Sequence, residues 1–284
     1  MNSFFFRVDA NINTGYGHAG RCITLAQELK RKKAKIFFIV EPCSKFFFKK
    51  FKDIQLIILP RNKLSMSQDA NFVLNCVSKK KKDSTWIIKD HYDLDYNWEA
   101  TVYKNFNNLM VIDDKLNTPH ICKIYLNKCA FKEKDLKRKK KIKYFLLGFK
   151  YILIKNILKK VKRDYNRCIV YFGGVDNKNY TLKVIKQLVL IKGLKVNFDI
   201  YLGKYNCSRK KIEKIIKNNK KFEIKSFNKL FINKLSKCNY YIGSMGTSLW
   251  EILYFKTIPL IIPSQNDHKY ILEILRKKNV IKCL

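Results

Sequence analysis

Short runs of hydrophobic residues alternate along the whole chain with segments in which hydrophobic residues recur every three or four positions. A short, continuous apolar run is typical of a buried strand, and the longer period is typical of a helix that packs one face on a sheet. Residues 19–31 illustrate the helical period, because their apolar side chains fall on one face: Cys22, Leu25, Ala26 and Leu29. Strand–helix alternation of this kind predicts parallel sheets with helices on both faces, which is the α/β class.

In the first half of the chain, the pattern predicts strands at residues 4–8, 35–40, 55–59, 86–89, 109–112 and 123–126, with helices at residues 19–31, 67–78 and 97–105. In the second half, it predicts strands at residues 168–172, 196–202, 222–224, 240–242 and 259–262, with helices at residues 179–191, 208–218, 228–236, 247–255 and 269–278. The two series are separated near residues 147–160, after a highly charged stretch at residues 131–143. We therefore expect two Rossmann-like domains, residues 1–150 and 151–284, facing each other across a cleft lined by the carboxyl ends of the strands.

The formal charge of +38 first suggests a nucleic-acid partner. Only nine of the 60 basic residues are arginine, however, and the lysines are spread over the whole length. Proteins that read bases and phosphates usually rely on the arginine fork. We therefore expect no nucleic-acid partner, and we place lysine runs such as residues 137–143 at solvated helix ends and loops. The positive field still favours an anionic nucleotide substrate.

Nine cysteines are scattered without a Cys-x-x-Cys pair, which is typical of a protein in a reducing cytoplasm. The apolar run near the N-terminus is only three phenylalanines long and is followed by Arg7 and Asp9, so it predicts neither a signal peptide nor a membrane span. We expect a cytoplasmic monomer with no membrane insertion.

A glycine-rich loop follows the first predicted strand and leads into a helix predicted to open at about Ala19. Gly15, Gly17 and Gly20 allow the backbone to approach a ligand closely, and the helix N-terminus offers free N–H groups to a diphosphate or a developing anion. Gly15, Gly17 and Gly20 have the spacing of the dinucleotide fingerprint Gly-x-Gly-x-x-Gly, but a single match of this kind is weak evidence for a dinucleotide site.

His18 stands at the mouth of this helix, and Arg21 follows one turn later on the same face. A neutral imidazole at this position can take a proton from water at physiological pH. A helix-capping histidine without chemistry is the alternative, and the glycine-rich context favours function. His120 and His268 have no such context, and we predict both as surface or capping residues.

Two further predicted strands end in polar residues. Asp90, His91 and Tyr92 follow the strand at residues 86–89, and Asp113 and Asp114 follow the strand at residues 109–112. Acidic residues at neighbouring strand ends can orient a histidine, bind sugar hydroxyls or hold a metal ion. Helix caps and turn residues are the alternative for each of them alone.

The second half repeats the arrangement of polar loops after strands. Gly173 and Gly174 follow one strand and form a turn that can accommodate phosphate. The loop at residues 243–247 leads into a helix, and its N–H groups with the hydroxyls of Ser244 and Thr247 can cradle a diphosphate. Glu251, one turn into that helix, can accept both ribose hydroxyls; a solvated acid favourable to the helix dipole is the alternative.

These segments together resemble the UDP-sugar hydrolases of pseudaminic acid biosynthesis over nearly the whole chain. The matching pieces are FRVD, GYGHAGR, KDHY, DDK, LNKCAF, GFKYILI, YFGGVD, GSMGTSLWEI and SQND, in the family's order. The resemblance implies the two-domain glycosyltransferase-B fold of the lipid II-forming N-acetylglucosamine transferase. It implies hydrolysis of UDP-2,4-diacetamido-2,4,6-trideoxy-β-L-altropyranose to UDP and the free sugar, with inversion and with neither a metal ion nor another cofactor.

By the same resemblance, His18 corresponds to the histidine that activates water. The other residues fall into two groups. The pocket or orienting positions of the N-terminal domain are Gly17, Asp90, Tyr92 and Asp113. Besides these, we expect Gly15 and Arg21, in the same loop and helix as His18, to bind the substrate. The nucleotide-binding positions of the C-terminal domain are Gly173, Gly174, Ser244, Gly246, Thr247, Glu251 and Asn266. Asp267 replaces the family's usual glutamine beside Asn266. The residue that orients His18 stays open among Asp9, Asp90 and Asp113.

Three other activities compete with this hypothesis. A UDP-sugar glycosyltransferase of the same fold would use the histidine to deprotonate an acceptor hydroxyl. A hydrolysing UDP-sugar 2-epimerase shares the fold and depends on acidic residues. A nucleic-acid-binding module would bind random RNA in a salt-sensitive manner and more tightly than UDP.

Overall fold

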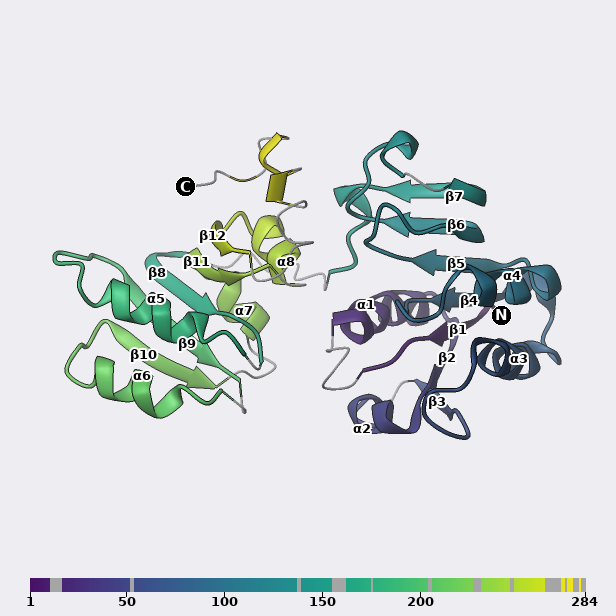
Figure 1. The fold of residues 1–284 in the computed structure, drawn as a ribbon, viewed down its shortest axis with the longest axis horizontal. Helices are drawn as coiled ribbons and strands as arrows, with labels where there is room; N and C mark the ends of the chain where they lie inside the picture. Colours follow the sequence, from purple (N-terminus) through teal and green to yellow (C-terminus); the bar gives the residue numbers. More distant parts are fainter. Residues whose placement is uncertain are drawn as a thin grey trace. The chain divides into compact units, whose positions relative to one another are not determined.

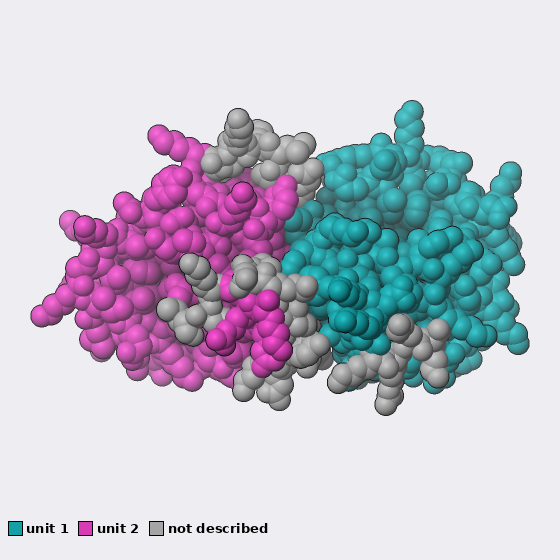
Figure 2. Space-filling model, turned by 90° about the horizontal axis from the view of Figure 1, so that it is seen from above, with its two compact units in different colours: residues 1–155 teal, residues 156–284 magenta. Residues whose placement is uncertain are grey.

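A computed structural model of the chain describes residues 1–10, 17–51, 54–136, 139–154, 162–174, 176–203, 206–226, 231–245, 248–263, 272–273, 275–277 and 281. The chain divides into two compact units, Met1–Lys155 and Asn156–Leu284 (Figures 1 and 2). Among the described residues, no helix has both the length and the apolar character that a membrane span requires.

The first unit is built on a seven-stranded sheet in the order β3-β2-β1-β4-β5-β6-β7, and all of its strand pairs are parallel. Its strands are β1 (Ser3–Arg7), β2 (Lys35–Val40), β3 (Gln55–Ile58), β4 (Thr85–Lys89), β5 (Leu109–Ile112), β6 (His120–Asn127) and β7 (Lys139–Leu147). Its helices are α1 (Gly17–Arg31), α2 (Lys45–Phe48), α3 (Met66–Val77) and α4 (Tyr96–Asn105), with short 3-10 turns at Pro42–Ser44, Lys82–Ser84, Glu133–Asp135 and Phe149–Tyr151.

The second unit contains a five-stranded parallel sheet in the order β10-β9-β8-β11-β12. Its strands are β8 (Asp164–Tyr171), β9 (Asn197–Leu202), β10 (Phe222–Ser226), β11 (Cys238–Ser244) and β12 (Ile258–Ile262). Its helices are α5 (Tyr180–Leu188), α6 (Arg209–Ile216), α7 (Phe231–Leu235) and α8 (Ser248–Tyr254).

Both sheets reverse their strand order beside the first strand of the unit. In the first unit the reversal lies between β1 and β4, and in the second it lies between β8 and β11. Loops at the carboxyl ends of two such strands diverge to opposite faces of the sheet and leave room for a ligand between them. The predicted α/β class with two Rossmann-like sheets is therefore confirmed, and each unit has one edge suited to a ligand.

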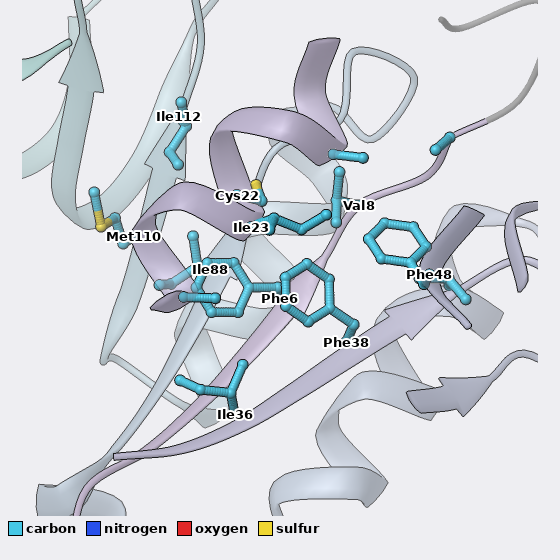
Figure 3. Packing of buried hydrophobic residues seen from close by; sticks show 14 of the residues in the cluster. Phe6, Val8, Cys22, Ile23, Ile36, Phe38, Phe48, Ile88, Met110 and Ile112 are labelled. Carbon is cyan, nitrogen blue, oxygen red and sulfur yellow. The ribbon is translucent and has the colours of Figure 1, made fainter. Parts of the chain in front are cut away.

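Aromatic side chains hold the first sheet together. Consecutive residues of a strand point to opposite faces, so the phenylalanine run of β1 fills the core on both sides. Phe6 stacks on Phe38 of β2 with ring centroids 4.7 Å apart, and Phe5 stacks on Phe37 at 4.3 Å. Figure 3 shows Cys22 of α1 in the cluster that contains Phe6, and Cys22 is fully buried. This packing fixes α1 on the sheet and so determines where its first turn lies.

Two helices of the first unit begin at side-chain caps. The Ser65 hydroxyl accepts the Gln68 N–H at the start of α3, and the Gln68 side chain accepts the Ser65 N–H in return. The Asp95 carboxylate accepts the N–H groups of Asn97 and Trp98 at the start of α4. Such caps satisfy N–H groups that have no partner within the helix. The α4 cap places Glu99 inside the unit, where it is fully buried.

The structure corrects the prediction that the lysine run at residues 137–143 lies in a loop or at a helix end. Residues from Lys139 onward form β7, which pairs with β6 at the edge of the first sheet. An edge strand tolerates charged side chains and gains from them, because charge discourages pairing with another chain. The helix predicted at residues 269–278 falls largely outside the described residues.

Candidate functional site

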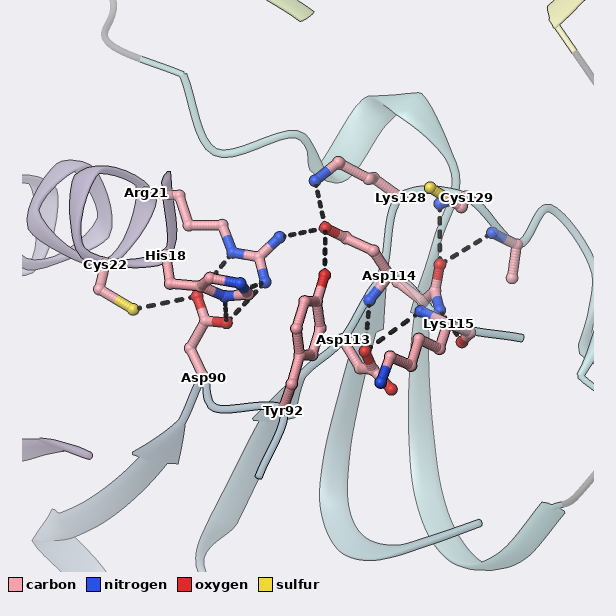
Figure 4. Close-up of polar contacts among 12 residues, drawn as sticks. His18, Arg21, Cys22, Asp90, Tyr92, Asp113, Asp114, Lys115, Lys128 and Cys129 are labelled. Carbon is pink, nitrogen blue, oxygen red and sulfur yellow. Dashed lines mark hydrogen bonds and ion pairs between the residues drawn. The ribbon is translucent and has the colours of Figure 1, made fainter. Parts of the chain in front are cut away.

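His18 and Asp90 meet where the first sheet reverses its strand order. His18 lies in the first turn of α1, and Asp90 directly follows β4, the strand that pairs with β1 (Figure 4). His18 Nδ1 is 2.6 Å from Asp90 Oδ1. The Asp90 side chain is fully buried, and the His18 side chain is 17% exposed. One end of this pair is therefore fixed inside the protein while the imidazole reaches the surface.

The contact determines which ring nitrogen of His18 carries the proton. An ionised carboxylate only accepts hydrogen bonds, so Nδ1 must donate to Asp90. In the neutral ring, Nε2 then carries the lone pair and can accept a proton from a bound water molecule. Arg21 Nη2 also lies 3.2 Å from Nδ1, but it is only 2.6 Å from Asp90 Oδ1, which is the acceptor for its proton.

Asp90 is held as an anion by the residues around it. Arg21 of α1 forks both carboxylate oxygens, with Nε 2.6 Å from Oδ2 and Nη2 2.6 Å from Oδ1. Burial by itself raises the pKa of Asp90, but the charges and hydrogen bonds of Arg21 and His18 outweigh it and lower the pKa well below its usual range. The Cys22 thiol donates to Oδ2 at 3.3 Å. Burial and the Asp90 charge raise the pKa of that thiol, so Cys22 remains a neutral donor.

Asp114, in the loop that follows β5, extends the network beyond Arg21. Its Oδ2 lies 2.6 Å from Arg21 Nη1 and 2.7 Å from Lys128 Nζ. Burial raises the pKa of Asp114, whereas the charges of Lys128 and Arg21 lower it, and the result is a pKa of about 2. Lys128 follows β6 and is absent from the sequence-based site, because nothing in its spacing relates it to Asp114.

Tyr92 packs against the ring of His18. Its ring meets the His18 ring edge-on with centroids 4.4 Å apart, and Lys115 Nζ lies 4.6 Å above its face. The Tyr92 hydroxyl is 3.5 Å from Asp114 Oδ2. Burial and the negative charge of Asp114 raise the pKa of this phenol far above its usual value, so it stays protonated as a donor. With 45% of the residue exposed, Tyr92 is accessible to a ligand beside His18.

The three candidate partners of His18 have different neighbours. Asp90 contacts His18, as described above. Asp9 accepts hydrogen bonds from the Arg7 guanidinium at 2.6 Å and from His91 Nε2 at 3.1 Å. Asp113 lies 3.0 Å from His120 Nε2 through Oδ2. Asp90 is therefore the residue positioned to orient His18.

The structure corrects the prediction for His120. We expected a surface or capping histidine, but the residue is only 2% exposed and lies between two carboxylates, Glu99 and Asp113. Sequence spacing gave no signal for this arrangement, because Glu99 lies on α4 and Asp113 follows β5. A histidine at the start of a strand whose residues are mostly buried is the one sign that could have suggested burial.

Three predicted residues of the second unit, Gly173, Gly174 and Ser244, lie at the reversal point of its sheet. Gly173 and Gly174 follow β8, and Ser244 is the last residue of the neighbouring strand β11. Gly173 has a φ of +91°, a conformation that side-chain-bearing residues rarely adopt, so the turn depends on glycine. Glu251 lies in the first turn of α8. Four predicted residues, Gly15, Gly246, Thr247 and Asn266, lie outside the described residues.

Glycines at the ends of neighbouring strands also allow the backbone segments here to approach closely. A Cβ atom on Gly203, which follows β9, would lie 1.7 Å from the carbonyl oxygen of Gly174. A Cβ on Gly243 of β11 would lie 2.0 Å from the carbonyl oxygen of Tyr171. The sequence-based site did not include Gly203, although a glycine directly after a strand is a recognisable sign of close backbone approach.

Comparison with known proteins identifies the fold. The chain matches no known family in a scan against family descriptions. It is 26% identical over 279 residues to an uncharacterised protein of Methanocaldococcus jannaschii; the match covers 91% of this chain and spans 55% of the length of that relative.

Among solved structures, MurG of Acinetobacter baumannii matches with a TM-score of 0.68 at 10% identity, covering 99% of this chain and 85% of that one. A putative UDP-N-acetylglucosamine 2-epimerase of Listeria monocytogenes matches with a TM-score of 0.65 at 11% identity, covering 95% of this chain and 81% of that one. Both units together therefore have the glycosyltransferase-B fold.

Proposed function

We propose that this chain is an enzyme that hydrolyses a UDP-linked sugar, with His18 as the general base. The observation that carries the proposal is the 2.6 Å contact between His18 Nδ1 and Asp90, which places the lone pair of the neutral ring on Nε2. The fold supports the broader part of the proposal, because the Listeria protein of this fold is named as a putative UDP-N-acetylglucosamine 2-epimerase. The sequence motifs around His18 support the narrower part.

In the proposed reaction, Nε2 takes a proton from water while the water oxygen forms a bond to the anomeric carbon of the sugar. The bond between that carbon and the diphosphate oxygen breaks, and its electron pair leaves with UDP. Attack from the face opposite UDP inverts the anomeric configuration. Asp90 stabilises the imidazolium that forms, and Arg21 keeps Asp90 ionised. A positioned base of this kind contributes about 10²–10⁴ in rate.

We propose that the second unit binds the UDP part of the substrate. The glycine turn after β8 and the end of β11 offer backbone N–H groups at the reversal point of that sheet. Glu251 supplies a carboxylate in the first turn of α8, where it can accept the ribose hydroxyls. The positive net charge of the chain attracts the diphosphate.

The substrate that the sequence motifs favour is UDP-2,4-diacetamido-2,4,6-trideoxy-β-L-altropyranose, and the pathway is pseudaminic acid biosynthesis. We place the reaction in the cytoplasm, since the cysteines of the described residues are all free thiols. The test is to incubate the protein with this substrate and no acceptor, and to follow UDP release and the anomeric proton of the product by NMR. Release of UDP with an inverted free sugar is expected; turnover that requires an added acceptor would contradict hydrolysis.

A UDP-sugar glycosyltransferase is the second candidate, and the structural likeness to MurG favours it. In that reaction His18 would deprotonate an acceptor hydroxyl instead of water, with the same Asp90 contact. A 2-epimerase is a third candidate, favoured by the likeness to the Listeria protein. The acceptor-free assay separates the three, because a transferase releases UDP only with an acceptor and an epimerase changes the configuration at C2 of the product.

A further inference from the structure

His120 is bonded through both of its ring nitrogens to carboxylates in the interior of the first unit. Nδ1 is 2.9 Å from Glu99 Oε1, and Nε2 is 3.0 Å from Asp113 Oδ2. Ionised carboxylates only accept, so both nitrogens must donate, and the ring is an imidazolium. A histidine with two such partners is a fixed, charged link between α4 and the loop that follows β5.

The charges around His120 alternate from one element to the next. Lys89 of β4 lies 2.6 Å from Glu99 Oε1, the same oxygen that faces His120 Nδ1. Lys89, Glu99, His120 and Asp113 thus alternate in sign, and each buried charge has an opposite neighbour. On its own strand, His120 faces Tyr125, whose ring centroid is 4.8 Å away. The thiol of Cys122, also on β6, is kept neutral because burial and the Glu99 charge raise its pKa. Removing the His120 charge would leave two carboxylates with a single buried cation.

Asp113 connects this cluster to the candidate site through its second oxygen. Asp113 Oδ1 accepts the backbone N–H of Asp114 at 2.7 Å and that of Lys115 at 3.1 Å. With Oδ2 bonded to His120, the carboxylate cannot rotate without losing a partner on one side. The orientation of this carboxylate therefore sets the backbone from which the Asp114 side chain reaches Arg21.

The loop has a second anchor that involves no hydrogen bond of His120. The Lys115 carbonyl accepts the Asn127 amide at 2.8 Å and the Tyr125 hydroxyl at 3.2 Å. Loss of His120 is therefore expected to shift the Asp113 carboxylate and the Asp114 backbone while the loop stays attached to the sheet. The effect should appear in the geometry of the site more than in the fold.

We infer that His120 is a positioning residue for His18: clamped between Glu99 and Asp113, it holds the loop whose Asp114 fixes Arg21 against Asp90. The path runs from Asp114 to Arg21 Nη1 at 2.6 Å, from Arg21 to Asp90, and from Asp90 to His18 Nδ1. The catalytic part of this inference rests on the proposed function, because it assigns His120 a share in the turnover at His18.

A dependence on pH follows from the charge of His120. Burial lowers its pKa, but the hydrogen bonds that His120 donates to Asp113 and Glu99, together with their charges, outweigh burial and raise the pKa above the ordinary 6.5. A raised pKa in the folded state means that the stabilisation is complete below the unfolded value and is lost as the pH rises through the folded value. Turnover is therefore expected to fall on the alkaline side as His120 loses its proton.

The first test needs no substrate and uses the intact chain. Nitrogen-15 NMR of the four histidines is expected to show both His120 nitrogens protonated at about pH 7. In His120→Gln, the Nδ1 proton signal of His18 is expected to weaken or shift as its hydrogen bond loosens. A His120 ring with a single proton at that pH would overturn the inference, and so would an unchanged His18 signal in the variant. If His120→Gln does not fold, the His18 signal is measured in His120→Asn instead, and the wild-type spectrum still tests whether both His120 nitrogens are protonated.

The second test measures turnover as UDP release. His120→Gln is expected to lower kcat about tenfold or more with little change in KM, and to remove the alkaline decline of the wild type. Val102→Ala, which opens a cavity on the same helix as Glu99, is the matched control for lost stability. Equal losses of kcat in both variants, or a wild-type pH profile in His120→Gln, would overturn the inference. A wild type without turnover would contradict the proposed function instead, and the NMR test would then decide the role of His120.

Discussion

Asp90 binds His18 Nδ1 at 2.6 Å and receives both arms of the Arg21 fork, so one buried carboxylate fixes two side chains of α1 at once. His18 and Arg21 lie on α1, the helix that follows β1, and Asp90 directly follows β4, the strand that pairs with β1. The helix therefore cannot turn or slide without breaking charged hydrogen bonds, which are among the stronger polar contacts in proteins. This rigidity is what a base needs if it is to hold one water molecule in line with a bond.

His18→Ala is expected to abolish most turnover and to leave UDP affinity nearly unchanged. The variant removes the base while the proposed nucleotide-binding residues lie in the second unit. We expect kcat to fall by about 10²–10⁴, with the dissociation constant of UDP within about twofold of wild type. UDP release and isothermal titration calorimetry measure the two quantities.

His91→Gln provides the matched control for that variant. His91 is also bonded to an aspartate in the first unit, with Nε2 3.1 Å from Asp9, but it has no contact with Asp90 among the described interactions. It should lose much less turnover than His18→Ala. Equal losses in the two variants, or near-normal turnover in His18→Ala, would refute the role assigned to His18.

The sequence predicted the elements that carry this site because each has a simple pattern. The helical period at residues 19–31 became α1, and the apolar run at residues 86–89 became β4. In a parallel sheet the carboxyl ends of all strands fall on one edge. His18 and Asp90 both follow strands of the first sheet, so the sequence could place them at the same edge. The choice among Asp9, Asp90 and Asp113 could not be made, because it depends on side-chain directions that no sequence pattern encodes.

Two errors have a different origin. The strand β7 was missed because lysine dominates its first residues, and only its place at the sheet edge makes such a strand acceptable. His120 was misplaced because its partners, Glu99 and Asp113, belong to other elements. Buried charge networks join residues that are distant in sequence, so they become visible only when the fold is known.

Asp114→Asn is expected to lower the free energy of unfolding at neutral pH and to lower it less at acidic pH. A pKa lowered from 3.8 to about 2 means that the ionised carboxylate stabilises the fold above pH 4 or so, and that this contribution is lost as the pH falls through about 2. The shift corresponds to on the order of 2 kcal/mol at pH 7. Urea unfolding of wild type and variant at several pH values should show free energies of unfolding that converge towards low pH.

Asp164→Asn is the matched control for this measurement. Asp164 also pairs with an arginine, and the Arg167 hydrogen bond lowers its pKa, but its side chain is 43% exposed. Exposed pairs of this kind contribute little, so the control should stay within about 1 kcal/mol of wild type at every pH. A constant difference between Asp114→Asn and wild type down to low pH would show that lost packing, rather than lost charge, weakens the variant.

Glu251→Ala is expected to reduce UDP affinity while sparing the base. If the carboxylate accepts the ribose hydroxyls, its loss removes charged hydrogen bonds of about 1.5–3 kcal/mol, or roughly 10- to 100-fold in the dissociation constant. Uridine diphosphate and uracil are the two ligands to titrate, since uracil lacks the ribose and should bind wild type and variant alike. Unchanged UDP affinity would return Glu251 to the simpler role of an acid in the first turn of α8.

Gly203→Ala, a change in the residue that follows β9, is expected to displace the Gly173–Gly174 turn. The new Cβ would lie 1.7 Å from the Gly174 carbonyl oxygen, a distance at which backbone must move, and the Gly173–Gly174 turn is the part that can yield. We expect a lower melting temperature for the second unit and a loss of UDP affinity of about tenfold or more. Gly20→Ala is the control, because a Cβ there meets no atom within 4 Å on α1 and should hold or raise stability by up to about 1 kcal/mol. A Gly203→Ala variant that melts at a lower temperature but binds UDP normally would show that the packing of β9 is independent of nucleotide binding. That result would contradict the proposal that the turn after β8 binds the diphosphate.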